Sequence, residues 1–344
     1  MNESGSTADT PSGTKTVGVD WVGMSELVTF GETPVEFTPP GHRRLATTPE
    51  TSVHVDGTES SAAVAATVLG GACTWVSKLP DSPLGRRVAG QLRRHGVDTE
   101  VAWADPDETR QGLVFRESGQ PPRADGVWHD REDTAAATAS PGDLPMDLVQ
   151  EANAVFTGVS TPALSEQAAT TTEAMLRAAH GSDATTAADL DYQPGLGSPE
   201  RYRETLTDLL GHLDVLVANE DDAARVLEWS GQPRELAHTI AANYDLEVVV
   251  ITRSQGAVAL EDTPGTNVVH EREGIETDAV DATGQHAAFD GGFLQRFVVA
   301  GDVADALGYG VAAATLSRTE PGPLLTADRE EIERLVDRLG DSAR

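Results

Sequence analysis

From Ala154 onward, strand-like and helix-like segments alternate along the chain, and this alternation constrains the fold more than any other feature of the sequence. Val248–Ile251 is a continuous apolar run of the kind found in a parallel strand that is covered on both faces. Strands that alternate with helices form right-handed βαβ units, so we predict an α/β protein with a mainly parallel central sheet. The expected strands are Val155–Phe156, Thr186–Leu190, Leu213–Ala218 and Glu247–Thr252, and the expected helices are Ala163–Ala179, Pro199–Leu210 and Asp221–Trp229.

The N-terminal part of the ordered chain is richer in short strands. Leu27–Phe30 predicts a strand that ends in a turn, and helices are expected over Ser60–Leu69 and Leu84–His95. The remaining short strands, within about 33–57 and 97–131, are not needed for the parallel sheet. We expect them to form a small second sheet, a lid over one edge of the first.

The charge of the chain excludes two classes of function. The sequence has 56 acidic and 25 basic residues, a formal net charge of −31. Such a field repels nucleic-acid phosphates, and no polybasic face is available to dock on an anionic membrane. The acidity favours adaptation to high salt over a specialised acidic ligand surface, because concentrated salt screens the self-repulsion.

Cysteine, targeting and membrane signals are sparse. Cys73 is the sole cysteine, lies in a strand-like apolar segment and is expected in the core, so a disulfide framework or a cysteine zinc site is excluded. No apolar run approaches the roughly 20 residues of a membrane span. We expect a cytoplasmic protein, and the sequence assigns no residue as a metal ligand. Residues 1–24 and 340–344 are predicted to be tails around an ordered domain at 25–339, and the sequence leaves open whether Met1 or Met24 is the start.

The segment Asp281–Phe293 carries the strongest chemical signal. A strand-like Thr277–Val280 precedes it, and a helix is expected over Ala287–Phe297. A glycine turn that enters a helix presents unpaired backbone N–H groups and the positive end of the helix dipole, which together suit an anion. An ordinary strand-to-helix turn is the alternative interpretation of this segment alone.

The same segment resembles the Asp-x-x-Gly-x-Gly-Asp signature of the PfkB/ribokinase family of carbohydrate kinases. Asp281, Gly284 and the run Phe289–Phe293 match in spacing, whereas His286 replaces the second glycine and Ala287 replaces the aspartate that is the family's catalytic base. The resemblance implies a ribokinase-like three-layer sandwich with a β-sheet lid, and ATP with Mg²⁺ as cofactors. It places an anion hole at Gly284, Gln285 and His286.

Further motifs extend the resemblance from about Ser25 to Leu339, and they look most like the 2-keto-3-deoxygluconate kinases of salt-loving archaea. Asp189–Pro194 resembles their Asp-x-Asn-Tyr-Arg-Pro segment, with Asp191 in the asparagine place and Gln193 in the arginine place. By resemblance, the residues expected to bind an acidic sugar are Gly57, Ser61, Arg110, Arg123, His129, Arg131 and Gln193. Those expected to bind the nucleotide are Asn219, Asp222, Thr252, Gly256, Asp281 and Gly284.

Two classes of function stay open. The first is ATP-dependent phosphorylation of 2-keto-3-deoxygluconate or a related sugar, slow or absent because Ala287 cannot accept a proton. The second is a non-catalytic protein that binds sugar or nucleotide and acts through a partner, and the family suggests a homodimer through the lid. Asp290, one helical turn later, or His286 could replace the base; otherwise Asp290 is an exposed helix residue and His286 a loop residue.

Overall fold

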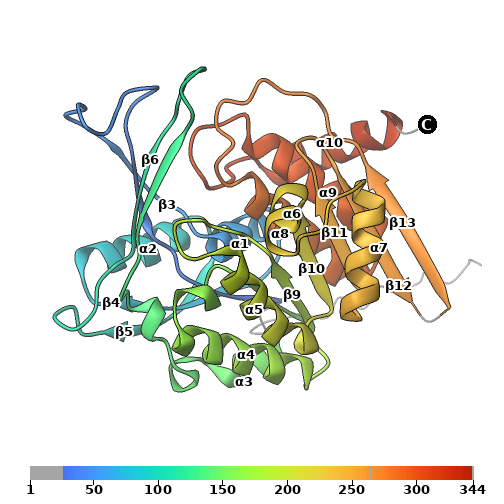
Figure 1. The fold of residues 1–344 in the computed structure, drawn as a ribbon, viewed down its shortest axis with the longest axis horizontal. Helices are drawn as coiled ribbons and strands as arrows, with labels where there is room; N and C mark the ends of the chain where they lie inside the picture. The colour runs from blue at the N-terminus through green and yellow to red at the C-terminus, as the bar shows by residue number, and fades with distance from the viewer. Residues whose placement is uncertain (1–25, 264, 343–344) are drawn as a thin grey trace, which may run out of the picture.

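In the computed structural model, which describes residues 26–263 and 265–342, the chain is organised around one large sheet (Figure 1). Within the described residues the sheet has nine strands, in the order β13-β12-β11-β10-β9-β8-β1-β4-β5. Neighbouring strands run parallel, except that β12 is antiparallel to both of its neighbours, β11 and β13. The strands are β1 (Leu27–Phe30), β4 (Cys73–Pro80), β5 (Asp98–Ala104), β8 (Ala154–Gly158), β9 (Thr185–Asp189), β10 (Val215–Asn219), β11 (Val248–Thr252), β12 (Ala257–Thr263) and β13 (Thr266–Arg272).

Helices cover both faces of this sheet, which confirms the predicted three layers. One face packs against α1 (Thr58–Val68), α2 (Pro83–Arg94), α8 (Gln285–Ala300), α9 (Val303–Ser317) and α10 (Arg329–Ser342). The other packs against α3 (Met146–Glu151), α4 (Glu166–His180), α5 (Pro199–Leu209), α6 (Glu220–Val226) and α7 (Pro233–Tyr244). Short 3-10 turns lie at Ala136–Thr138, Pro141–Asp143, Pro162–Leu164 and Leu210–His212.

The apolar run in β11 shows why the parallel strands are buried on both faces. Val248 and Val250 belong to the core on the α8 side, and Val249 and Ile251 belong to the core on the α7 side. Successive strand residues point to opposite faces, so a strand between two helical layers needs an apolar residue at every position. Cys73 is likewise buried in a strand, as predicted.

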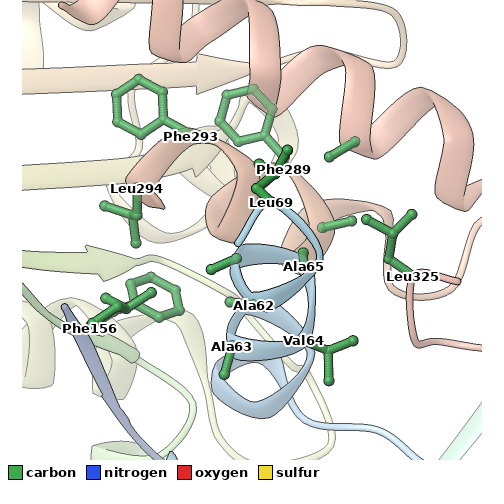
Figure 2. Packing of buried hydrophobic residues seen from close by; sticks show 14 of the residues in the cluster. Ala62, Ala63, Val64, Ala65, Leu69, Phe156, Phe289, Phe293, Leu294 and Leu325 are labelled. Carbon is green, nitrogen blue, oxygen red and sulfur yellow. The ribbon is translucent and has the colours of Figure 1, made fainter. Parts of the chain in front are cut away.

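Helices α1 and α8 approach each other closely through small residues (Figure 2). A Cβ atom added to Gly291 would lie 2.1 Å from the backbone oxygen of Ala62, so only glycine allows this contact. Phe289 and Phe293 extend from α8 on the other side of the contact, stacked with their ring centroids 6.0 Å apart. This packing fixes the N-terminus of α8 beside the sheet.

A second sheet of four strands forms the predicted lid, and it stands away from the main body in Figure 1. Its order is β3-β2-β6-β7, from β3 (Ser52–Val55), β2 (Val35–Thr38), β6 (Leu113–Glu117) and β7 (Gly126–Asp130). The expected range 97–131 was too wide for the lid. Its first strand, β5, pairs in parallel with β4 and forms the edge of the main sheet.

Three other boundaries differ from the predictions. Thr277–Val280 forms no strand, because it enters the α8 turn as irregular backbone instead of joining the sheet. Helix α8 begins at Gln285 rather than Ala287, since Gly284 caps it. Helix α10 continues to Ser342, past the expected end of the domain at 339. The predicted tail 1–24 lies outside the described residues.

Within the described part of the chain, no helix combines the length and the apolar character that crossing a membrane requires.

Candidate functional site

A cavity of about 340 Å³ lies between the lid and the carboxyl ends of the central strands. We call it the lid cavity; it is lined in part by Asp56, Arg116, Arg131, Asp191 and Ala287. From β1 the chain adds β4 and β5 on one side and then β8 to β11 on the other. Open α/β sheets bind ligands at such a switch point, outside the carboxyl ends of the strands. The volume lies in the range of small-molecule sites.

The N-terminus of α8 forms one wall of the lid cavity. Its cap, Gly284, has a φ of 79°, and a Cβ atom there would lie 2.0 Å from the backbone oxygen of Pro323. Both facts require glycine. The first backbone N–H groups of the helix face an anion site of the predicted kind. His286 has no positive φ and is therefore unstrained in place of glycine.

The side chain at the third position of α8 is the methyl group of Ala287, which lines the cavity. One turn further, Asp290 is fully buried and does not line the cavity, so its expectation as an exposed helix residue is wrong. Burial raises the pKa of Asp290 well above its usual value. No N–H or O–H group of another residue donates to either carboxyl oxygen of Asp290. A hydrogen bond between the neighbouring carboxyl groups of Asp290 and Asp189 requires that one of the two is protonated.

A chain of hydrogen bonds crosses the floor of the lid cavity. The buried Arg131 donates from Nε to Glu32 at 2.6 Å and from Nη1 to the Gln193 amide oxygen at 2.6 Å. The Gln193 amide nitrogen then donates to Asp191 Oδ1 at 2.9 Å. The other Asp191 oxygen accepts from Thr58 Oγ1 at 2.8 Å and from Ser160 Oγ at 2.6 Å. These bonds hold six side chains from five different chain segments in one arrangement.

The lid supplies a second ionic group on the opposite wall. Arg116 of β6 donates from Nε to Glu36 at 2.7 Å and from Nη2 to Asp56 at 3.4 Å. Desolvation, together with the negative charge of Glu36, raises the pKa of Asp56 to about 7, although Arg116 opposes the shift. Arg116 is thus shared by two carboxyl groups.

Buried titratable groups around the cavity favour their neutral forms. Desolvation raises the pKa of Glu59 to about 7, against the bonds it accepts from Thr161 and Gly158. Desolvation lowers the pKa of His129 to about 4, helped by the positive charge of Arg131. The pKa of His286 is also lowered by burial. Both histidines are therefore uncharged near pH 7, and the lowered pKa makes His286 a weaker base than an exposed histidine.

A second, much smaller cavity lies on the other side of His286. We call it the Gly256 cleft; it has a volume of about 30 Å³ and is lined in part by Thr252, Gly256, Gln285, His286 and Arg318. Thr252 Oγ1 and His286 Nδ1 are 3.5 Å apart. Arg318 Nη1 donates to the backbone oxygen of Ser254 at 2.9 Å. The space that remains holds one or two water molecules.

The family is decided by comparison with known proteins. A model described as "pfkB family carbohydrate kinase" matches residues 24–329. The chain belongs to the pfkB family of carbohydrate kinases.

Curated pfkB relatives and solved structures agree with this assignment. The chain is 44% identical over 318 residues to the 2-dehydro-3-deoxygalactonokinase of Haloferax volcanii, a match that covers 92% of this chain and 98% of the relative. It is 26% identical to the 2-dehydro-3-deoxygluconokinase of Thermoproteus tenax, over 85% of this chain and 88% of the relative.

Among solved structures, the 2-dehydro-3-deoxygluconokinase of Thermotoga maritima aligns with a TM-score of 0.82 and 28% identity, covering 91% of this chain and 99% of that one. A fructokinase from Xylella fastidiosa with bound ATP aligns with a TM-score of 0.79 and 17% identity, covering 92% and 100%. The predicted ribokinase-like architecture is therefore confirmed.

The pfkB motif residues expected to bind sugar are only partly gathered by the fold. Those that line the lid cavity are Gly57, His129, Arg131 and Gln193. Ser61 is buried inside α1 and does not line the cavity. Arg110 is paired with Asp130 at 2.6 Å, and Arg123 donates to the backbone oxygens of His42 and Ser118. Both arginines are used to hold the lid and its loops, so the structure does not bring them to the cavity.

The residues expected to bind nucleotide are also divided. Thr252 and Gly256 line the Gly256 cleft, and Gly284 lines the lid cavity. Asn219 lines neither: it caps α6 by accepting from the Asp222 backbone N–H at 2.8 Å, and its amide donates to the Asp222 carboxyl. Asp281 accepts from the backbone N–H groups of Thr283 and Gly322, which ties the α8 turn to the loop after α9.

The site departs from the pfkB pattern for its cofactors in two places. The Gly256 cleft leaves about 30 Å³ free, and the carboxylate of the signature is replaced by a methyl group. Within residues 26–263 and 265–342, no group of three His, Cys, Asp or Glu side chains is arranged to hold a metal ion.

Sequence reasoning missed several polar side chains of the lid cavity, among them Glu32, Asp56, Thr58, Arg116, Ser160 and Asp191 as an acceptor. Arg116 is one of 25 basic residues, and nothing in its strand separates it from surface arginines. Asp191 had a usable signal, because it follows a strand of the parallel sheet and such positions meet at one edge.

Proposed function

We propose that this chain binds a sugar in the lid cavity and transfers phosphate from ATP slowly or not at all. The observation that carries the proposal is Ala287 at the N-terminus of α8, where the pfkB signature has its catalytic carboxylate. A methyl group cannot take a proton from a sugar hydroxyl, and a general base typically contributes 10²–10⁴-fold to a rate.

The neighbouring groups give no replacement for that base. Asp290 lies about 4.5 Å further along the helix and is sealed in the core beside Asp189. His286 is buried and contacts Thr252 at the Gly256 cleft. Asp191 does line the lid cavity, but two hydroxyl groups and an amide already occupy three of its roughly four acceptor positions.

The small free volume of the Gly256 cleft gives independent support. Positioning of the nucleotide is the larger part of phosphoryl-transfer catalysis, because the protein contributes little covalent chemistry. A cleft of about 30 Å³ offers no such positioning. The lid cavity, by contrast, has kept a volume of about 340 Å³ and a connected polar floor.

The second candidate is an active kinase of a 2-keto-3-deoxy sugar acid. It is favoured by the 44% identity to the Haloferax volcanii 2-dehydro-3-deoxygalactonokinase. In that case the Gly256 cleft would open on binding, and another group would serve as base.

The experiment compares this chain with the Haloferax volcanii relative, purified and assayed side by side in about 2 M KCl. Phosphate transfer from Mg-ATP is measured with 2-keto-3-deoxygalactonate, 2-keto-3-deoxygluconate and a panel of uncharged sugars, and sugar binding is measured by calorimetry. We expect at least one sugar to bind, with turnover at least about 100-fold below that of the relative. Turnover within about tenfold of the relative, on any of these sugars, would overturn the proposal and favour the second candidate.

A further inference from the structure

The cations of the lid cavity are already neutralised by the protein. Arg131 and Glu32 form an ion pair at 2.6 Å in which the side chains are only 3% and 1% exposed. Arg116 lies between Glu36 and Asp56. A carboxylate on a ligand would therefore meet guanidinium groups whose charge the protein carboxylates already balance, and it would add a further negative charge beside them.

The remaining charge of the cavity is negative. Asp191 lines it and has only neutral donors: two hydroxyl groups and the amide of Gln193. Around the two arginines and Asp191, four carboxyl groups face two guanidinium groups, and negative charge is still in excess although the pKa of Asp56 is about 7. The two histidines on the cavity wall add no positive charge near neutral pH, because burial lowers the pKa of each. An anion that enters the cavity meets a like charge and no free cation at this wall.

The cavity is nevertheless well equipped for hydroxyl groups. The carboxyl oxygens of Asp191 and Asp56 can accept from ligand O–H donors, since each carboxylate has about four acceptor positions. The hydroxyl groups of Thr58 and Ser160 lie beside Asp191 and hold it in place. Several acceptors around a small polar volume match a molecule with several hydroxyl groups and no charge.

We infer that the ligand of the lid cavity is an uncharged sugar or sugar alcohol, and that Glu32 and Asp191 set this preference against sugar acids. The inference rests on the proposed function above, because it presumes that the lid cavity binds a sugar. It differs from the substrates named for the 2-dehydro-3-deoxygalactonokinase and 2-dehydro-3-deoxygluconokinase relatives, which carry a carboxylate.

The test uses pairs of ligands that differ at one carbon. Calorimetry on the full chain at pH 7 in about 2 M KCl compares glucitol with gluconate and galactitol with galactonate, and includes 2-keto-3-deoxygluconate as a third acid. In at least one pair we expect the alcohol to bind at least tenfold more tightly than its acid. Salt at this concentration screens the exposed acidic surface, so the difference reports on the buried cavity.

Two variants locate the cause. Glu32→Gln keeps the shape of the side chain and removes the charge that neutralises Arg131, and Asp191→Asn removes the excess charge. Each is expected to raise the ratio of acid affinity to alcohol affinity about tenfold. Glu173→Gln, which alters an exposed ion pair on α4, is the control and should leave the ratio unchanged. Two variants are used because either buried site could affect folding, which thermal unfolding monitors.

The outcomes separate this inference from the proposed function. If, in both pairs, the acid binds the unaltered chain as tightly as its alcohol, or more tightly, the inference is wrong and the proposed sugar binding stands. If neither alcohols, acids nor the wider sugar panel bind, both fail. If alcohols are preferred but neither variant moves the ratio, the assignment to Glu32 and Asp191 is wrong.

Discussion

The lid cavity and the Gly256 cleft lie on two sides of the same helix N-terminus, and they differ in what their side chains do. In the lid cavity, Arg131, Gln193 and Asp191 bond to one another and leave about 340 Å³ free. In the Gly256 cleft, side chains occupy the space and leave about 30 Å³. His286 belongs to the lining of both.

Under the proposed function, the two halves of the site have diverged separately on one scaffold. The scaffold residues that need small size, Gly284 and Gly291, are kept because the backbone and α1 approach them closely. The polar residues that chemistry needs have no such packing constraint. A binding cavity can therefore persist where the transfer machinery is lost.

The largest expected effect concerns one arginine from each of the two regions. Arg131→Met leaves Glu32 buried without its cation, and we expect a loss of about 3–5 kcal/mol in the free energy of unfolding. Arg318→Met in the Gly256 cleft removes one exposed hydrogen bond and should cost less than about 1 kcal/mol. Urea unfolding of both variants measures the difference. Equal losses in the free energy of unfolding would show that the Arg131 contacts of the lid cavity stabilise the fold no more than the Arg318 contact of the cleft.

The next effect is a pH dependence that originates under the lid cavity. The pKa of Glu59 is raised from 4.5 to about 7, so the folded state holds this proton more tightly than the unfolded state. The stabilisation is complete below about pH 4.5 and is lost as the pH rises to about 7, a decrease of about 3 kcal/mol. The groups that face Glu59 are Thr161, the Gly158 N–H, Asp191 and Asp290.

Glu59→Gln tests this, because an amide oxygen can accept the same bonds without titrating. Its unfolding free energy, measured from pH 4.5 to 8, should fall less steeply than that of the unaltered chain. The exposed Glu173→Gln variant serves as a control for the general acidity of the surface. Parallel curves for all three proteins would refute the role of Glu59.

A smaller effect is expected from restoring the signature carboxylate. Ala287→Asp should raise phosphoryl transfer by less than about tenfold, because the Gly256 cleft remains closed to the nucleotide. A gain of 100-fold or more, the usual range for a general base, would mean that the cleft opens readily and that the two regions have not diverged separately. Single-turnover assays with Mg-ATP and the bound sugar distinguish the two results.

The last effect concerns the outer face of the lid, where we expect a homodimer contact. Trp128 is 52% exposed there, next to Leu45 and Phe115, whereas Trp103 is 45% exposed on the edge strand β5. Trp128→Ser should weaken self-association about tenfold in light scattering, and Trp103→Ser should not. If the unaltered chain stays monomeric at all concentrations, the expected homodimer does not form.

Much of the architecture follows from local pattern. The apolar run of β11 and the alternation after Ala154 specify a parallel sheet between helical layers, because only that arrangement buries both faces of each strand. Thr277–Val280 forms no strand, because a segment of β-like composition becomes a strand only where it pairs with another strand. The lid boundary was misplaced because β5 pairs with β4, a long-range contact that local pattern does not encode.

The sequence by itself determined the fold class, the family motifs and the loss of the carboxylate at Ala287, since these depend on residue type and spacing along the chain. Only the tertiary structure decided that Asp290 is sealed in the core, that Arg110 and Arg123 are used by the lid, and that Arg131 is already neutralised by Glu32. The physical reason is that charge pairing and burial join residues far apart in the chain. Arg131 and Glu32 are 99 positions apart, and no local pattern indicates that they meet.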